Sequence, residues 1–111
     1  MMHVFHIDAG EMMAGLTEQI AAAGIRDGAI VSLIGGVESF TISTMPADDA
    51  TADTISTYQM PGEMHGSGEV RDGVLHVHAT MGVQGDRAVV GHLHAAEVRT
   101  HFARAYVMPT A

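Results

Sequence analysis

The N-terminal third of the chain changes its hydrophobic period from two to about four. The side chains of Met1–Ile7 alternate between two faces, which predicts a short first strand. Apolar residues then recur three or four positions apart, which predicts a helix over Ala9–Ala23. Asp8, with Glu11 three residues later, has the pattern of a capping box, and Gly24 is suited to end the helix. The inner stripe of this helix is Met13, Leu16, Ile20 and Ala23.

The rest of the chain has the short, β-branched and turn-bounded segments that are typical of strands. Gly35-Gly36 interrupts one such run, which implies a bulge, a bend or a close backbone approach. Asp72-Gly73 is a two-residue hairpin signal. We therefore expect an α+β domain over residues 1–111, with one main N-terminal helix packed on a curved, largely antiparallel sheet or barrel of about seven or eight strands. The expected strands after the helix are Ala29–Ile34, Val37–Thr44, Thr54–Met60, Glu63–Val70, Val74–Met81, one after the next turn, and Glu97–Met108.

Two His-x-His pairs, at His76/His78 and His92/His94, hold half of the eight histidines of the chain. Side chains of a strand alternate between its faces, so each pair presents both imidazoles on one side. The residues between and beside the first pair are apolar and read as the core side. One face of this strand thus packs against the core, and the other face carries the imidazoles.

The spacing of the two pairs predicts that they meet. If the chain reverses near Gly85, an antiparallel register sets His78 opposite His92 and His76 opposite His94. Directly opposed residues lie on one face with Cβ atoms about 4.5–5.5 Å apart. A slip of one residue would send the second pair to the other face. The prediction of one imidazole cluster therefore depends on the parity of this loop.

Carboxylates occur on both sides of the predicted cluster. Centring the preceding hairpin on Asp72-Gly73 pairs Glu69 with His76 and Ser67 with His78. Alternation then places Glu63 and His65 on the same face as well. Glu63, Glu69 and Glu97 are three candidates for a general acid or base, or for a group that orients a histidine, and the sequence does not choose among them.

Composition and charge exclude several classes of function. Thirteen acidic residues stand against five arginines and no lysine, a formal net charge of -8, so phosphate-driven binding of nucleic acid by this chain is disfavoured. The absence of cysteine excludes a disulfide framework and a metal site with thiolate ligands. The sequence shows no membrane-spanning or leader segment, so a cytoplasmic location is expected. Asp48-Asp49 lies in a small polar loop, residues 45–53, without the spacing of a calcium loop.

Three interpretations of the histidine cluster compete. The histidines could be independent surface or core residues, a metal site, or a patch that responds to pH. We favour the metal site, because three nitrogens from rigid strands leave a coordination position open, as catalytic zinc sites do. Imidazole also suits iron, nickel, cobalt and copper, so the identity of the metal stays open. We interpret His3, His6 and His101 as structural.

Several of these motifs together resemble a known family. Leu-His-Val-His at Leu75–His78, Gly-His-Leu at Gly91–Leu93, the run at residues 23–37 and the Gly-Glu segment starting at Gly62 resemble the plants-and-prokaryotes conserved (PPC) domain. The match covers nearly the whole chain. The resemblance implies an α/β domain that assembles as a homotrimer, with a zinc site at His76, His78 and His92. The fold of that family is also similar to that of acetolactate decarboxylase, a zinc enzyme with three histidine ligands.

The resemblance also marks where this chain differs from the family. Plant members bind DNA through an Arg-Gly-Arg-Pro segment that is not present here, so no direct nucleic-acid binding is expected. Val90 replaces a glycine that often precedes Gly91, and His94 replaces an apolar residue, so His94 could add a fourth ligand and close the site. Two alternatives to metal-dependent chemistry on a small molecule stay open: a non-enzymatic regulatory or interaction module, and a cupin-like metal protein. Whether the chain is an enzyme is left undecided.

Overall fold

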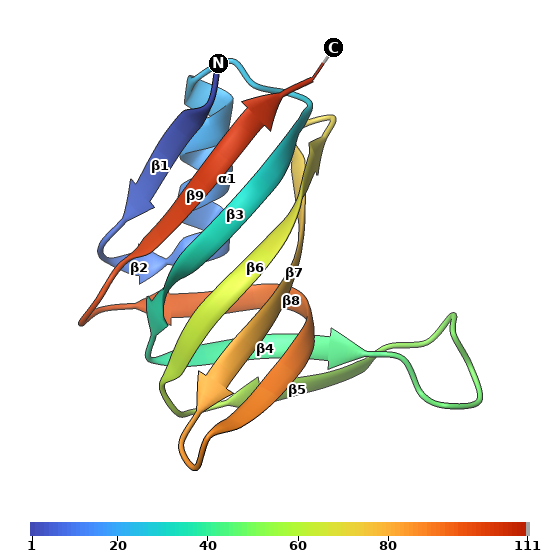
Figure 1. Cartoon of the computed structure of the whole chain (residues 1–111). Helices are drawn as coiled ribbons and strands as arrows, with labels where there is room; N and C mark the ends of the chain where they lie inside the picture. Colours follow the sequence, from blue (N-terminus) through green and yellow to red (C-terminus); the bar gives the residue numbers. More distant parts are fainter. Residues whose placement is uncertain (111) are drawn as a thin grey trace.

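Nine strands and one short helix make up the computed structural model, which describes residues 1–110 (Figure 1). All the strands belong to one antiparallel sheet, in the order β1-β9-β3-β6-β7-β8-β4-β5, with β2 paired to β8. In chain order the elements are β1 (His3–Ile7), β2 (Gly10–Glu11), α1 (Met12–Ala22), β3 (Gly28–Val37), β4 (Ser39–Thr44), β5 (Thr54–Tyr58), β6 (Gly62–Arg71), β7 (Val74–Val83), β8 (Arg87–Val98) and β9 (Ala103–Pro109).

The expected architecture of seven or eight strands in a sheet or barrel is wrong. The sheet has nine strands and is open, because β1 pairs only with β9 and β5 pairs only with β4. The extra strand, β2, is two residues long and too short to leave a periodic signal. The last strand was also placed wrongly: Glu97 and Val98 continue β8, and β9 begins at Ala103.

Helix α1 begins later than its apolar spacing predicted. Glu11, not Asp8, is the N-cap: its carboxylate accepts hydrogen bonds from the backbone N–H groups of Met13 (2.9 Å) and Ala14 (2.8 Å). The same carboxylate accepts the Ala96 N–H at 2.9 Å, so it fastens the helix to β8. Three backbone N–H groups therefore donate to this one carboxylate, which explains why a glutamate is stable at this position. Gly24, at φ +77°, follows the helix end as predicted.

The core lies between α1 and the inner faces of the strands. Met12, Leu16 and Ile20 of the helix are fully buried, whereas Met13 is half-buried and Ala23 is exposed, so the buried stripe is shifted from the predicted one. The helix lies behind β1 and β9 in the view of Figure 1, and its main contacts are with β1 and β8. Within residues 1–110 no helix is long and apolar enough to cross a membrane. The opposite face of β1, β9 and β3 has no covering element in the described chain.

The glycine pair in β3 does not break the strand. β3 continues through Gly35 and Gly36 to Val37 and stays paired with β6. A side chain at Gly35 would collide with the Phe102 carbonyl and with Ala103, so the glycine allows β9 and its preceding turn to approach closely. Of the three outcomes predicted for the pair, the close backbone approach is the one observed.

Candidate metal centre

Alternation along β7 places its histidines on the outer face of the sheet. Val77, Ala79 and Met81 are buried in the core, at 0–2% exposure. His76 and His78, between and beside them, therefore project to the opposite face, where both are exposed. The burial of one set of side chains thus fixes the direction of the other.

Two tight turns set the register of the neighbouring strands. Asp72 (φ +55°) and Gly73 (φ +80°) form the two-residue turn between β6 and β7, as predicted from their types. It pairs Ser67 with His78 and Glu69 with His76, which confirms the predicted register. The turn after β7 ends with Gly85 and Asp86 in the left-handed region and pairs His78 with His92, as expected.

Three imidazoles converge as a result. One nitrogen from each of His76, His78 and His92 lies within 4.8 Å of the other two. Their ring centroids are 4.9–5.7 Å apart. The trio joins two residues of β7 with one of β8, so a single strand pair holds all three. The sequence pattern predicted a cluster of four histidines that includes these three, and the family resemblance implies these three as the ligands.

His94 does not join the trio. The regular pairing of β7 with β8 ends at His78 and His92, so His94 has no directly opposed partner at His76. The register between β8 and β4 shifts at this point, with one extra residue in β8. His94 Nε2 and Ser43 Oγ share a hydrogen bond of 2.8 Å, and the His94 ring lies 4.7 Å from the His92 ring, centroid to centroid.

Ser43 is a residue that the sequence analysis missed. It is 3% exposed, and the His94 ring is its hydrogen-bond partner. The register puts Ser43 opposite His92, across the boundary between β4 and β8. No local signal could have found it, because β4 and β8 are far apart in the sequence and serine is common in strands.

The environment of His92 favours its neutral form. Partial burial is the main cause that lowers its pKa below the ordinary value of 6.5, and the neighbouring His94, His76 and His78 lower it further. Asp53 acts in the opposite direction but more weakly. A neutral imidazole has a lone pair free for a metal, and metal binding competes with protons. His92 is therefore favoured in the form that can bind a cation.

Only one of the three candidate carboxylates lies beside the trio. Glu69 Oε2 is 3.8 Å from His76 Nδ1, and its other oxygen is 3.8 Å from Arg71. Glu63 pairs with Gly82, six residues along β7 from His76, which is about 20 Å at 3.3 Å per residue. Glu97 pairs with Ser39 and Glu11 on the part of β8 beyond His94. The structure thus separates Glu69 from the other two.

A hollow of about 340 Å³ opens beside the histidines. It is lined by Ser67, Gly68, Glu69, His76 and His78. A side chain at Gly68 would collide with the His76 carbonyl, so the glycine lets β6 approach β7 closely under this hollow. The hollow therefore places a hydroxyl and a carboxylate next to two of the three imidazoles.

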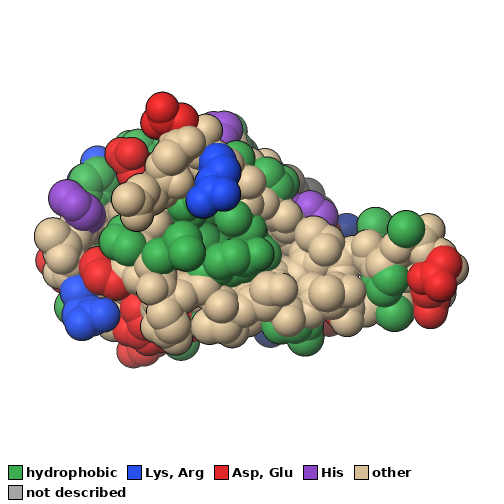
Figure 2. All heavy atoms as spheres, turned by 90° about the horizontal axis from the view of Figure 1, so that it is seen from below, with side chains coloured by type: hydrophobic (Ala, Val, Ile, Leu, Met, Phe, Trp, Pro, Cys, Tyr) green, Lys and Arg blue, Asp and Glu red, His purple; other side chains and the backbone are tan. Residues whose placement is uncertain are grey.

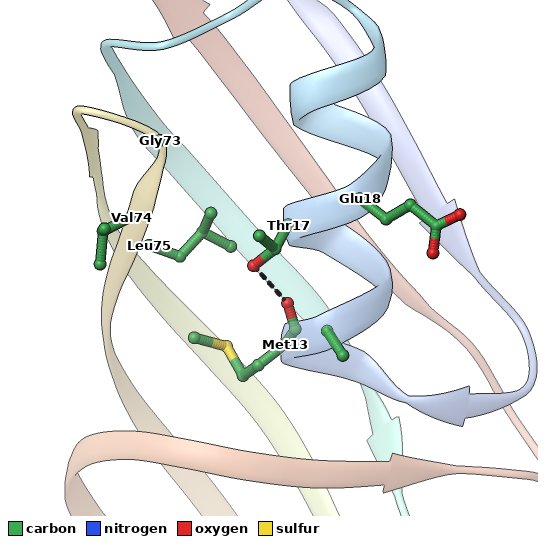
Figure 3. Close-up of a pocket in the computed structure, with 7 residues that line it drawn as sticks. Met13, Thr17, Glu18, Gly73, Val74 and Leu75 are labelled. Carbon is green, nitrogen blue, oxygen red and sulfur yellow. Dashed lines mark hydrogen bonds between the residues drawn. The ribbon is translucent and has the colours of Figure 1, made fainter.

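A larger hollow, of about 530 Å³, lies between α1 and the turn that starts β7 (Figure 3). Leu75 points toward the helix there, whereas Glu18 points away from the cavity. The Thr17 hydroxyl is occupied, since it donates to the Met13 carbonyl at 2.7 Å. The hollow is mainly apolar, and its one ionisable lining residue is Glu18, so it offers no cluster of metal ligands.

The donor set fits a transition metal. A tetrahedral ion about 2.0–2.1 Å from each nitrogen needs the nitrogens about 3.3 Å apart, somewhat closer than the 4.8 Å limit of the trio. The exposed rings of His76 and His78 would have to rotate to reach this separation. Three neutral nitrogens without a carboxylate or a thiolate favour zinc and the other first-row ions over calcium or magnesium.

Comparison with known proteins supports the fold and gives a family match. The family model of the Plants and Prokaryotes Conserved domain (PCC, also written PPC) matches residues 1–109. No curated protein matches the sequence.

Solved structures with low sequence identity share the fold. A metal-containing protein from Archaeoglobus fulgidus has a TM-score of 0.80 at 24% identity, over 98% of this chain and 79% of its own. A candidate DNA-binding protein from Bacteroides thetaiotaomicron has a TM-score of 0.80 at 22% identity, over 99% and 79%. Acetolactate decarboxylase from Bacillus subtilis has a TM-score of 0.62 at 12% identity, over 100% of this chain but 52% of its own.

Proposed function

Since the chain belongs to the Plants and Prokaryotes Conserved domain family, we propose that it is a metal-binding domain whose ligands are His76, His78 and His92. The observation that carries the proposal is the convergence of three ligand nitrogens within 4.8 Å. The fold shared with a metal-containing protein of Archaeoglobus fulgidus supports it. Zinc is the first choice, because it is commonly held by three histidines with a fourth position free.

The site suits chemistry on a small polar molecule. An ion held by three imidazoles can polarise a carbonyl or lower the pKa of a bound water to about 7. The protein contributes the hollow beside it, where Ser67 and Glu69 face the space that a ligand would fill. The Glu69 carboxylate would accept a hydrogen bond from a hydroxyl or amine of that ligand, and Ser67 would orient it. His94, bonded to Ser43, leaves the fourth position to the ligand.

Titration of metal-free protein with zinc tests the proposal. The protein is freed of its tag and treated with a chelator, and binding is followed by isothermal titration calorimetry. We expect one zinc per chain for the wild type and a loss of affinity of about 100-fold or more in His78→Ala, beyond the 10–100-fold typical of residues that only support a ligand.

His65→Ala is the matched control. His65 is an exposed histidine on β6, paired with Thr80 on the same sheet, and it is not among the three converging residues. We expect this variant to keep the stoichiometry and affinity of the wild type. Zinc binding that is unchanged in His78→Ala, or the absence of binding by folded wild type, would overturn the assignment.

We also propose that copies of the chain assemble as a trimer, the state that the family resemblance implies. Light scattering coupled to size-exclusion chromatography measures the molar mass directly. A mass of three times 11.7 kDa is expected. A monomer at 100 µM, a concentration of about the order used for structural work, would exclude a stable trimer.

A further inference from the structure

Residues 44–55 form an arm that projects from the body of the molecule. They comprise the ends of β4 and β5 and the loop between them, which extends to one side in Figure 1. The arm is ordered by bonds of its own: Asp49 Oδ1 accepts the Thr51 N–H (2.9 Å) and hydroxyl (2.6 Å), and the Asp49 N–H donates to the Pro46 carbonyl. It nevertheless buries little of its own apolar surface, since Met45 is 63% and Ile55 is 59% exposed.

The arm is also acidic. Asp48, Asp49 and Asp53 lie on it, and residues 44–55 contain no lysine, arginine or histidine. In Figure 2 its apolar side chains lie along the projection and acidic side chains lie at its far end. The Thr51 hydroxyl and N–H lower the pKa of Asp49 below its ordinary value, so this carboxylate stays ionised. A structured, apolar and negatively charged projection is suited to a surface of the opposite charge.

The other edge of the sheet offers such a surface. The uncovered face of β1, β9 and β3 exposes four large apolar side chains: Val4 (54%), Val31 (53%), Ile34 (38%) and Met108 (36%). Arg104 lies among them, because the register pairs it with His6 on one side and Ile34 on the other. Within residues 1–110 no carboxylate lies within 4 Å of the Arg104 guanidinium, which rests over the Phe102 ring at 4.4 Å.

We propose that the uncovered face of β1, β9 and β3 receives the arm of a second copy of this chain. Met45 and Ile55 would pack on Val4, Val31 and Ile34, and Asp48 and Asp49 would pair with Arg104. The arm cannot reach this face of its own chain, because β4 and β1 are separated by five strands in the sheet. The contact therefore joins different surfaces of two copies, and a head-to-tail repetition of it closes into a ring if the rotation between copies allows it.

The contact would also bring the neighbouring copy near the metal site. β3 is paired with β6, and Ala29 of β3 lies opposite Glu69, which lines the hollow. An arm seated on Val31 and Ile34 would lie on the strand next to that hollow, two to five residues along β3 from Ala29, or about 7–17 Å at 3.3 Å per residue. The inference rests on the proposed assembly of the chain, and it does not depend on whether the histidines bind a metal.

Charge reversal tests the contact within one chain. Light scattering gives the mass of the wild type, of Arg104→Asp, and of the arm variant Asp48→Arg/Asp49→Arg. We expect each change alone to weaken self-association at least tenfold. The variant that combines all three substitutions should regain the oligomer, because the charges of arm and face are then exchanged. Salt at 0.5 M should weaken the wild-type contact as well.

Two further variants keep the test decisive. Ile55→Asp lies on the arm, away from the core, and should also dissociate the oligomer without loss of the circular dichroism of the fold. Arg87→Asp, an exposed arginine at the start of β8, should keep it. An oligomer that is unaffected by all the arm and face variants would overturn the contact while leaving the trimer intact. A monomeric wild type would overturn both, and zinc titration of the same samples reports separately on the metal site.

Discussion

One extra residue in β8 decides which imidazoles can share an ion. The parity of the hairpin predicted His78 opposite His92, and this pair is present because β7 buries alternate side chains against the core. The same argument placed His94 opposite His76, which the structure does not support. The bulge that turns His94 toward Ser43 forms where β8 meets β4, and a pattern confined to one hairpin has no information on that second partner.

The position of His94 gives a prediction about coordination. If the ring is held by Ser43 and not by the ion, His94→Ala should keep one zinc per chain, with an affinity within about threefold of the wild type by calorimetry. Removal of a group that supports a ligand costs 10–100-fold. A loss of tenfold or more would therefore show that His94 holds the ion or one of its ligands. Ser43→Ala is the companion variant, since it frees the His94 ring without removing it.

At the scale of the elements, the tight turns could be predicted from the sequence, whereas the hydrogen bonds between distant segments could not. The Asp72-Gly73 turn follows from two adjacent residues that tolerate positive φ, so the register of β6 on β7 could be derived from the sequence. The residue at which β8 ends could not be derived in this way. Glu38, between β3 and β4, accepts the N–H groups of Arg99 and Thr100 at 2.8 Å and so defines the turn before β9, at a separation of about sixty residues.

The stability that the hydrogen bonds of Glu38 contribute should depend on pH. The N–H groups of Thr100 and Arg99, with the charges of Arg99 and His101, lower the pKa of this carboxyl below its ordinary value of 4.5. A depressed pKa adds stability above the pKa of the unfolded chain, and that stability is lost as the pH falls through the folded value. Urea unfolding of Glu38→Gln should thus show lower stability at pH 7 and a smaller decrease between pH 5 and pH 3. Glu18→Gln, on an exposed helix position, is the control. An identical decrease in Glu38→Gln and wild type would contradict this role.

At the scale of the whole molecule, charge argues against one function of the wider family. The formal net charge is -8, and the five arginines are spread over two loops and three different strands. One structural relative is a candidate DNA-binding protein, but at 22% identity the likeness concerns the fold. Affinity for a duplex comes mainly from basic groups that neutralise phosphates. The acidic surface would repel the duplex at most approaches.

We therefore predict that the isolated chain does not bind duplex DNA. Fluorescence anisotropy of a labelled 20-base-pair duplex, at 0.15 M salt, should stay constant up to roughly 100 µM protein, near the weak end of non-specific binding. A repeat at 0.05 M salt should change little, because there are few phosphate contacts to strengthen. Saturable binding below 1 µM, with a steep decrease in higher salt, would show that a basic surface forms on assembly.

The carboxylate of Glu11 has a consequence for the order in which the chain can fold. It joins the start of α1 to Ala96, which lies 85 residues later in the sequence, and β8 is also the partner of β2, β4 and β7. The helix therefore lacks its hydrogen-bond partner on β8 until nearly all of the sheet has been synthesised. Folding that waits for such distant partners is slow, since the entropy of closing long loops is lost before the contacts form. On the ribosome, the N-terminal half should remain unfolded until β8 emerges, and only then can the three histidines come together.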